Sequence, residues 1–506
     1  MMLLHRLLLL CFFSSMSYLV QADSSFDDKS ITVAIDKIPL SFNPFSAPSL
    51  MDEQFKHLVF DPLFRWGSKK TIEPRLVKSW KRLDSQTVRF NLHENIHFHS
   101  GNLLTAKDVK WSFEQAVKEP SMYFLANIDD FKVNDDNSFD IRSPYNDHQL
   151  LDYLTHLFVL DSAYYSENTN LLTLAPSIIL PPYTDKNLPL SGTGPYLIQQ
   201  YNEMLGLVVS KNEQYWAEKP QIKYIRFMKV DEPQSRLFAL LADDVQVSYG
   251  VPNKEAVEFT DNTLKNLVKV SSSNIIFLTI NDNKSPVLQN NKAREALHLA
   301  INQPGILKYV LKNNGQVSSV SMPVKNARDA KNQTMPEYDL TKSKALLNKL
   351  NLPKQLTLLV LADEAGYNHK IAVALSKMLK MVDIEVVFNE TDSLDIWNTT
   401  LEGYDLTLSS WRTHLMDVYN VDEALFKNST LATYLNNKSL PQAANDHFDS
   451  QSKAFEFLQQ NNWVIPMFYQ DDIWAQSRAF NLADIFSSND IPYWSLFKTV
   501  GFEEAG

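Results

Sequence analysis

Apolar and polar residues alternate in several short stretches of this chain, and such alternation predicts half-buried β-strands. The first stretch is Lys29–Asp36, with the sequence KSITVAID. Tyr196–Ile198 and Gly206–Val209 follow as a predicted strand pair, and Ile222–Val230 alternates in the same way. The run Ile275–Asn281 is largely apolar, which predicts a mostly buried strand.

Other stretches carry apolar residues at the spacing of an amphipathic helix. In the second half of the chain, predicted helices alternate with predicted strands at Leu356–Leu361 and Ile384–Phe388. Alternating strands and helices at this spacing predict a largely parallel α/β lobe. The predicted helices are Met51–Phe64, Asp108–Val117, Asp231–Leu241, Lys292–Asn302, Tyr338–Leu350 and Tyr367–Met381.

The stretch SGTGPY at Ser191–Tyr196 is the most distinctive turn in the sequence. Gly192 and Gly194 lie two residues apart just before Pro195, in a chain that has 12 glycines among 506 residues. Glycine permits positive φ and proline fixes φ, so we expect a rigid, sharply turned loop. A nucleotide-binding loop is excluded, because Leu197 occupies the place of a third glycine and no Lys-Ser/Thr pair follows.

Three blocks of motifs follow one another along the chain. The first is GTGPY at 192–196, with the pairs Tyr-Trp and Lys-Pro within residues 215–220. The second, residues 72–109, contains PRLVKSW, FHSG and TAKDV. The third, within residues 275–302, contains Asn281, Arg294 and Asn302. Together they resemble the bacterial extracellular solute-binding proteins of family 5, the peptide/nickel group, over nearly all of residues 29–498.

The resemblance implies an α/β fold with two lobes and a hinge between them. The implied fold is that of a type II periplasmic binding protein of the large cluster, which has an extra subdomain. Residues 1–22 would be a signal peptide and residues 272–473 would be lobe II. Lobe I would comprise residues 23–60, 176–271 and 474–506, with residues 61–175 as its inserted subdomain. The implied function is that of the periplasmic substrate-binding component of an ABC importer. It would capture an oligopeptide or similar small solute between its lobes and deliver it to a membrane permease.

The N-terminus is typical of a cleavable signal peptide. Arg6 precedes the apolar run Leu7–Phe13, and Val20 and Ala22 supply aliphatic and small side chains at the −3 and −1 positions before a cleavage point at Asp23. This run is too short to span a bilayer, and we find no other apolar run of about 18 residues. Cys11 is the only cysteine, so the mature chain would have none. We therefore expect a periplasmic protein.

The resemblance also places the ligand site. The stretch Tyr404–Trp411 resembles a family strand, and the segment that follows it lines the cleft. In peptide-binding members an aspartate three residues past this tryptophan pairs with the peptide's α-ammonium, whereas this chain has His414. A buried ammonium needs a charged partner, so the ligand is left open between oligopeptide, oligosaccharide and metal chelate. The predicted ligand-binding residues are Trp411, Arg412, Thr413, His414, Asp417 and Tyr469.

Two of these residues have alternative interpretations. Arg412 has donors that suit a carboxylate or a hydroxylated ligand, unless its side chain simply faces solvent. Trp411 can stack on a sugar ring or a ligand side chain, or it can pack in the core. In the tail, Tyr493 and Trp494 are expected to be packing anchors on lobe I rather than ligand contacts.

Charge and motifs narrow the function classes further. The formal net charge is −11 and no basic stripe occurs, so we expect no nucleic-acid partner. The chain has no G-x-S-x-G or C-x-x-C motif, and we expect neither enzymatic activity nor a cofactor. His97 and His99 lie two apart without a second histidine pair nearby, so no metal site is predicted. We expect a monomer, and the alternative function is a ligand-sensing domain of a receptor or regulator.

Overall fold

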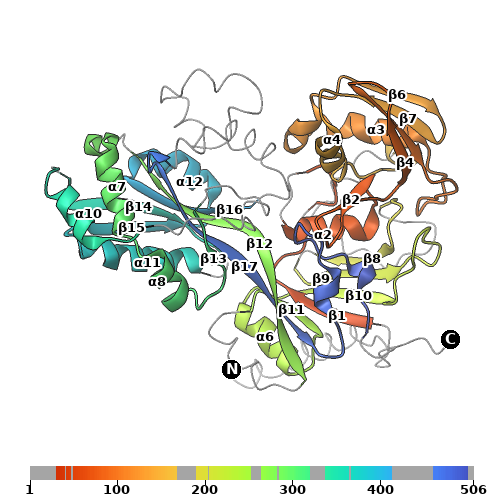
Figure 1. The fold of residues 1–506 in the computed structure, drawn as a ribbon. Helices are drawn as coiled ribbons and strands as arrows, with labels where there is room; N and C mark the ends of the chain where they lie inside the picture. Colours follow the sequence, from red (N-terminus) through yellow and green to blue (C-terminus); the bar gives the residue numbers. More distant parts are fainter. Residues whose placement is uncertain are drawn as a thin grey trace, which may run out of the picture.

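The computed structural model describes residues 30–39, 41–46, 50–167, 190–202, 204–251, 264–281, 284–319, 337–350, 352–363, 366–412 and 460–499. Figure 1 shows two groups of elements joined by two long strands, β12 (Lys265–Ile280) and β17 (Val464–Ser477). We call these the crossing strands. Lobe I denotes the elements before β12 together with residues 478–499, and lobe II denotes the elements between the crossing strands.

A single mixed sheet runs through both lobes. In the described part of the chain it has eleven strands, in the order β15-β14-β16-β12-β17-β11-β1-β10-β9-β8, and β13 also pairs with β17. The strands other than the crossing strands are β1 (Ser30–Ile35), β8 (Tyr196–Asn202), β9 (Gly206–Lys211), β10 (Tyr224–Lys229), β11 (Val247–Tyr249), β13 (Gln316–Val317), β14 (Gln355–Leu361), β15 (Glu385–Thr391) and β16 (Leu406–Trp411).

The strand directions confirm some predictions and correct one. β8 and β9 form the predicted antiparallel pair, and in lobe II β14 is parallel to both β15 and β16. The prediction of a largely parallel lobe II is only partly right, because β12 is antiparallel to both β16 and β17. The chain enters lobe II on one crossing strand and leaves on its neighbour, so these two strands must run in opposite directions.

Helices cover the sheet, and two smaller sheets complete lobe I. The smaller sheets are β2 (Phe64–Trp66) with β3 (Ile72–Pro74), and β4 (Val77–Arg82), β5 (Thr87–Leu92), β7 (Ser138–Arg142) and β6 (Asp130–Asp135) in that order. Lobe I has α2 (Leu50–Val59), α3 (Ala106–Ala116), α4 (Asp147–Leu154), α5 (Ser162–Glu167) and α6 (Pro233–Leu241). Lobe II has α7 (Asn291–Leu299), α8 (Gln303–Tyr309), α10 (Leu340–Leu347), α11 (Tyr367–Lys380) and α12 (Leu394–Thr400).

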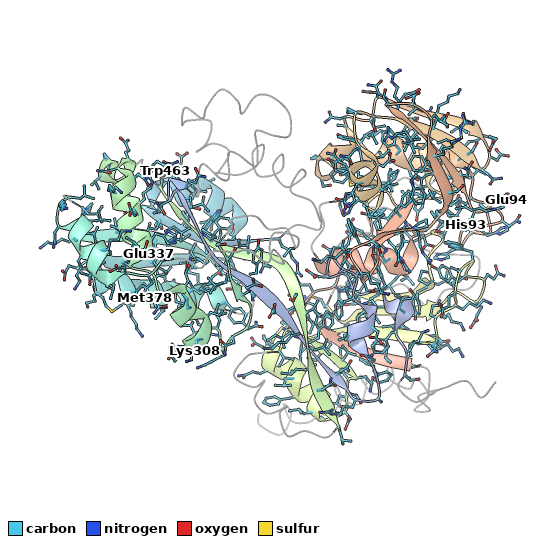
Figure 2. All side chains as sticks on the ribbon, in the orientation of Figure 1. His93, Glu94, Lys308, Glu337, Met378 and Trp463 are labelled. Carbon is cyan, nitrogen blue, oxygen red and sulfur yellow. The ribbon has the colours of Figure 1, made fainter. Side chains whose placement is uncertain are left out.

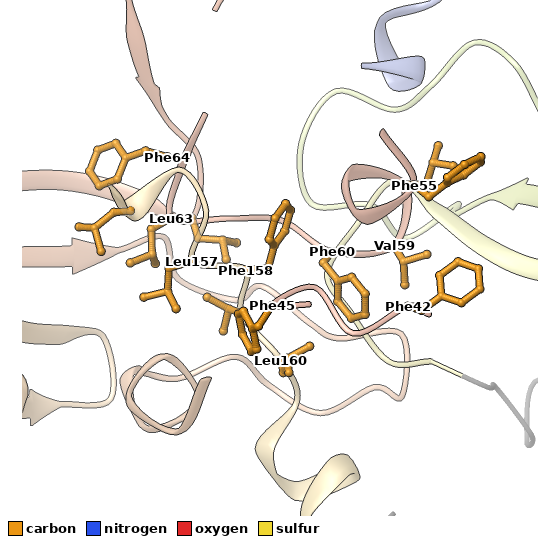
Figure 3. Packing of buried hydrophobic residues seen from close by; sticks show 14 of the residues in the cluster. Phe42, Phe45, Phe55, Val59, Phe60, Leu63, Phe64, Leu157, Phe158 and Leu160 are labelled. Carbon is orange, nitrogen blue, oxygen red and sulfur yellow. The ribbon is translucent and has the colours of Figure 1, made fainter. Parts of the chain in front are cut away.

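Each lobe has its own large apolar core. In lobe I the C-terminal end of α2 packs among aromatic side chains, including Phe55, Phe60 and Phe158 (Figure 3). A separate cluster fills lobe II, with residues between 276 and 408 and between 465 and 468. The tail packs on lobe I as predicted, since the Trp494 ring lies 5.3 Å from that of Phe227 and is 1% exposed.

The SGTGPY loop is fixed against the C-terminal end of α2. A Cβ at Gly192 would lie 2.0 Å from the Val59 carbonyl oxygen, and one at Gly194 would lie 2.4 Å from the Val59 carbonyl carbon. Neither glycine has positive φ, so the backbone argument made from the sequence is wrong here. Glycine is required because the loop backbone approaches the helix backbone too closely for a side chain.

The other motif residues converge on Asp61, whose side chain is 5% exposed. Arg75 Nε lies 2.9 Å from Asp61 Oδ1, and the Tyr215 hydroxyl lies 3.2 Å from the same oxygen. Trp216 Nε1 and the Thr193 hydroxyl donate to Oδ2 at 2.9 and 3.1 Å. A buried carboxylate is stable only when it is paired and hydrogen-bonded. These motifs therefore hold lobe I together and do not form a ligand site.

His99 contacts the same loop, and its burial makes the fold sensitive to acid. Its Nε2 lies 2.9 Å from the Gly194 carbonyl oxygen and its Nδ1 accepts from the Gly192 N–H at 3.4 Å, a pattern that requires the neutral ring. Burial lowers the pKa of His99 to about 4, from an ordinary value of 6.5. Between about pH 6.5 and pH 4, His99 is protonated in the unfolded chain but stays neutral in the folded protein.

We expect this difference to lower the free energy of unfolding by about 3 kcal/mol as the pH falls from about 6.5 to about 4. Urea unfolding across that range should give a shallower pH dependence for His99→Gln than for the wild type. His57, whose pKa burial lowers to about 3, contributes the same slope to both proteins. Equal slopes for the two proteins would contradict the prediction.

Candidate functional site

The crossing strands lose their regular pairing midway between the lobes. Ser271 pairs with Asp471 and Ile275 pairs with Tyr469, so residues 272–274 lie opposite Gln470 alone. A β-bulge of this kind bends a strand and interrupts its ladder. The irregular segment is polar, whereas the neighbouring lobe II segments, residues 275–280 of β12 and 464–469 of β17, are mostly apolar. This point is the hinge between the lobes.

Strand direction places a candidate ligand site beside the hinge. β11 runs antiparallel to β17 and therefore points toward lobe II, and β1 and β10 run parallel to β11. In the other lobe β16 runs antiparallel to β12, so both β16 and β14 point toward lobe I. In open α/β sheets, ligands bind outside the carboxyl ends of strands. Here the carboxyl ends of strands from both lobes are directed toward the crossing.

Arg412 joins three distant parts of the chain at this point. The guanidinium donates to Asp472 at 2.6 and 3.3 Å and to Asp490 at 3.3 Å, and Asp490 also accepts from the Ser273 N–H. The side chains of Arg412, Asp472 and Asp490 are 17%, 12% and 0% exposed. Burial on its own would lower the pKa of Arg412, but the two carboxylates outweigh burial and raise it. In this structure Arg412 binds carboxylates of the protein itself.

The structure places part of the predicted ligand site at the crossing. Trp411 is the last residue of β16 and pairs with Ile275, which pairs with Tyr469 on the other side. Trp411, Arg412 and Tyr469 thus come together at the hinge, and Tyr469 is fully buried. Their role in ligand binding stays a prediction. The other three predicted residues, Thr413, His414 and Asp417, lie outside the described residues.

Sequence reasoning missed a pocket beside β17 that both lobes line. Its volume is about 90 Å³, and its walls come from the end of β11 and the start of α6 in lobe I and from α11 in lobe II. A polar interruption in each crossing strand, at residues 271–274 and 470–472, was the sequence signal for this region. The main residues that sequence reasoning missed are Tyr249, Asn314, Tyr367, Lys370, Asp472 and Asp490.

The start of α11 is already occupied by an acidic side chain. Asp363 accepts from the N–H groups of Tyr367 and Asn368 at 3.0 and 2.6 Å. Burial raises the pKa of Asp363, although these two hydrogen bonds act to lower it. The N-terminus of α11 is therefore satisfied within the protein and is not an open anion site.

Residues 93–97 read HENIH and match the H-E-x-x-H pattern of zinc hydrolases, so the expectation from the sequence that this motif is absent is wrong. That pattern requires a helix, which brings both histidines to one face. Here the residues follow β5 in a turn where Asn95 has φ 60° (Figure 2 labels His93 and Glu94). The His93 ring lies 5.4 Å from that of Trp216, and His97 Nδ1 contacts the Asn95 carbonyl oxygen. Across the described residues, no three His, Cys, Asp or Glu side chains are grouped to hold a metal ion.

The fold and the hinge together indicate the class of protein to which the chain belongs. Two α/β lobes joined by paired crossing strands are the architecture of solute-binding proteins. The structure resembles the ABC transporter substrate-binding protein CtaP of Listeria monocytogenes, with a TM-score of 0.77 and 17% identity, over 93% of this chain and 99% of that one. It also resembles the Escherichia coli murein tripeptide binding protein MppA, with a TM-score of 0.74 and 18% identity, over 94% and 99%.

Residues 71–432 match the bacterial extracellular solute-binding proteins, family 5 Middle, and the chain belongs to this family. Its members are non-catalytic solute-binding proteins. The nickel-binding periplasmic protein of Escherichia coli is 27% identical over 58% of this chain, and the match spans 55% of that relative. The dipeptide-binding protein DppE of Bacillus subtilis is 22% identical over 89% of this chain and 88% of its own length. No described helix of the chain is both long and apolar enough to cross a membrane.

Proposed function

We propose that this protein is the substrate-binding component of an ABC importer. It captures an oligopeptide or a similar small solute between its lobes and delivers it to a membrane permease. The observation that carries the proposal is the hinge, where a pocket beside β17 is lined by the end of β11 in lobe I and by Asn314 and α11 residues of lobe II. A solute bound there contacts both lobes and favours the arrangement in which they close on it.

The same proposal covers location and ligand contacts. The protein is exported through a cleavable signal peptide, residues 1–22, and works in the periplasm as a monomer. Two relatives that support this location are named as periplasmic proteins. The proposed ligand contacts are Trp411, Arg412, Thr413, His414, Asp417 and Tyr469. N-terminal sequencing of the exported protein should begin at Asp23, and a start at Met1 would contradict the export proposal.

Native mass spectrometry of protein purified from the periplasm without refolding tests the function. We expect retained ligand, since a solute enclosed between two lobes is released slowly. A ladder of adducts at amino-acid spacing would identify peptides, and a single adduct of sugar or metal-chelate mass would identify another solute. Protein that carries no adduct and shows no thermal shift with peptides, sugars or nickel–histidine would contradict the proposal.

A further inference from the structure

The ion pairs of Arg412 connect the two lobes at the point where the crossing strands are least regular. Residues 272–274 of β12 lie opposite Gln470 alone, so the ladder that joins the crossing strands elsewhere is interrupted there. Arg412 directly follows β16 of lobe II. Its guanidinium contacts both Asp472 of β17 and Asp490 of the C-terminal tail. Side chains therefore bridge the place where the backbone pairing is lost.

Asp490 belongs to a loop that is fixed on lobe I. The Ser488 N–H donates to the Gly67 carbonyl oxygen at 2.9 Å, and the Tyr493 ring lies 4.8 Å from the ring of His57 in α2. The backbone of Asp490 has φ 71°, in the left-handed region that residues other than glycine seldom adopt. Such a conformation persists only where the surroundings determine it. The Asp490 carboxylate is therefore held in place by lobe I.

The Asp490 carboxylate also reaches the interrupted strand itself. One oxygen, Oδ2, accepts from the Ser273 N–H at 3.2 Å and from Arg412 Nη2 at 3.3 Å. The same Nη2 donates to Asp472 Oδ2 at 2.6 Å, and Nη1 donates to Asp472 Oδ1 at 3.3 Å. The guanidinium is thus a rigid fork between two carboxylates. A relative movement of the lobes by about 1 Å is enough to lengthen its contact with Asp490 beyond hydrogen-bonding distance.

Burial makes the contact between Arg412 and Asp490 costly to break. The two side chains are 17% and 0% exposed, so little water is at hand to replace the lost partner. An exposed pair such as Lys498 and Glu218 loses little when it is broken, because water and salt screen both charges. A buried charge that loses its partner is left uncompensated. The contact therefore resists any hinge motion that separates the two residues.

We propose that the Arg412–Asp490 ion pair is an interlobe latch. It holds the lobes in the arrangement of this structure, and it opens when the lobes move about the crossing strands. Asp472 keeps the guanidinium paired while the latch is open. The latch sets part of the free energy that a bound solute must supply before the lobes move. This inference goes beyond the proposed function, because it concerns the lobes and not the chemistry of the solute.

The distance between the lobes tests the latch. One spin label is attached at Lys107→Cys in α3 of lobe I and another at Lys377→Cys in α11 of lobe II, where both native side chains are exposed. Cys11 lies in the predicted signal peptide, so the mature protein has no competing thiol. Pulsed electron paramagnetic resonance on the mature protein, after removal of bound solute, gives the distribution of distances between the labels.

Asp490→Asn should populate lobe arrangements that the wild type rarely visits. Asparagine keeps an oxygen acceptor, tolerates the left-handed backbone at this position and removes only the charge. We expect the population at distances away from the main maximum to rise by at least about fivefold, the low end of the usual coupling between two sites. Arg412→Lys keeps the charge but loses the rigid fork, so it should act in the same direction. This second variant keeps the latch testable if Asp490→Asn does not fold.

Asp140→Asn is the matched control, because it breaks an ion pair that lies within lobe I. Arg89 Nε and Nη2 donate to the two Asp140 carboxylate oxygens at 2.7 and 2.9 Å, and both residues belong to the four-stranded sheet. This variant should leave the distribution of distances unchanged. An unchanged distribution in folded Asp490→Asn or folded Arg412→Lys, or equal broadening in Asp140→Asn, would overturn the inference.

The latch and the proposed function fail in different ways. If the protein retains a solute but Asp490→Asn leaves the distribution of distances unchanged, the latch is wrong and the transport function stands. If Asp490→Asn broadens the distribution and no solute binds, the latch stands and the proposed function fails.

Discussion

Arg412→Met should lower the free energy of unfolding by about 3–5 kcal/mol, the usual cost of removing one partner from a buried ion pair. The substitution leaves the carboxylates of Asp472 and Asp490 close together, and both are largely buried. Their repulsion is relieved when a proton binds, so the loss should be smaller at about pH 5 than at about pH 8. Urea unfolding at the two pH values measures both effects.

A second substitution separates charge from packing. Adding Asp490→Asn to Arg412→Met should restore at least about 1 kcal/mol, because it removes one of the two unpaired carboxylates. Lys498→Met is the control for an exposed pair. Lys498 lies 3.3 Å from Glu218, and the two side chains are 56% and 77% exposed. Its cost should lie within the range of surface pairs, about 0–1 kcal/mol. We call Arg412, Asp472 and Asp490 the hinge cluster. A similarly small cost for Arg412→Met would show that solvent screens the hinge cluster.

Gly192→Ala should lower the free energy of unfolding by about 3 kcal/mol, at the upper end of the usual cost of overpacking. The added methyl would lie 2.0 Å from the Val59 carbonyl oxygen and 2.6 Å from Phe60 Cδ1. The first of these atoms belongs to the backbone and cannot rotate away, so the loop or the end of α2 must shift. Thermal or urea unfolding of the variant measures the loss.

Gly403→Ala is the matched control for this change. An added Cβ at Gly403 has no atom within 4 Å, and its φ is not positive. Its effect should stay within about 0.5 kcal/mol. Equal effects of the two substitutions would mean that the close approach of the SGTGPY loop to α2 does not matter for stability.

Local patterns predicted most elements but not their ends. The stretch 231–241 was predicted as a helix, and α6 begins two residues later, where Pro233 takes a first-turn position that needs no N–H. The predicted helix 51–64 corresponds to α2, which ends at Val59, before the Asp61-Pro62 pair. The predicted strand at 275–281 is the second half of β12, which begins at Lys265. The more polar residues 265–271 belong to the strand because they pair with residues 471–477 of β17.

The hinge cluster could not be predicted in the same way. Arg412 was singled out from its place after Trp411, but its partner Asp490 is 78 residues away along the chain. Periodicity reports which face of an element is buried, and it carries no information about which distant charge lies opposite. The motif residues around Asp61 were recognised by family likeness, and their physical role in joining the SGTGPY loop to residues 61–75 became clear only from the contacts. The lobe boundaries stay a prediction.

The central position of β17 also governs the order in which the chain can fold during synthesis. β17 lies between β12 and β11 in the sheet, and Trp494, which follows it, packs on α2 near the start of the chain and on β10 in its middle. Neither lobe can complete its sheet until residues 464–477 have left the ribosome. The chain therefore remains incompletely folded for nearly the whole of its synthesis.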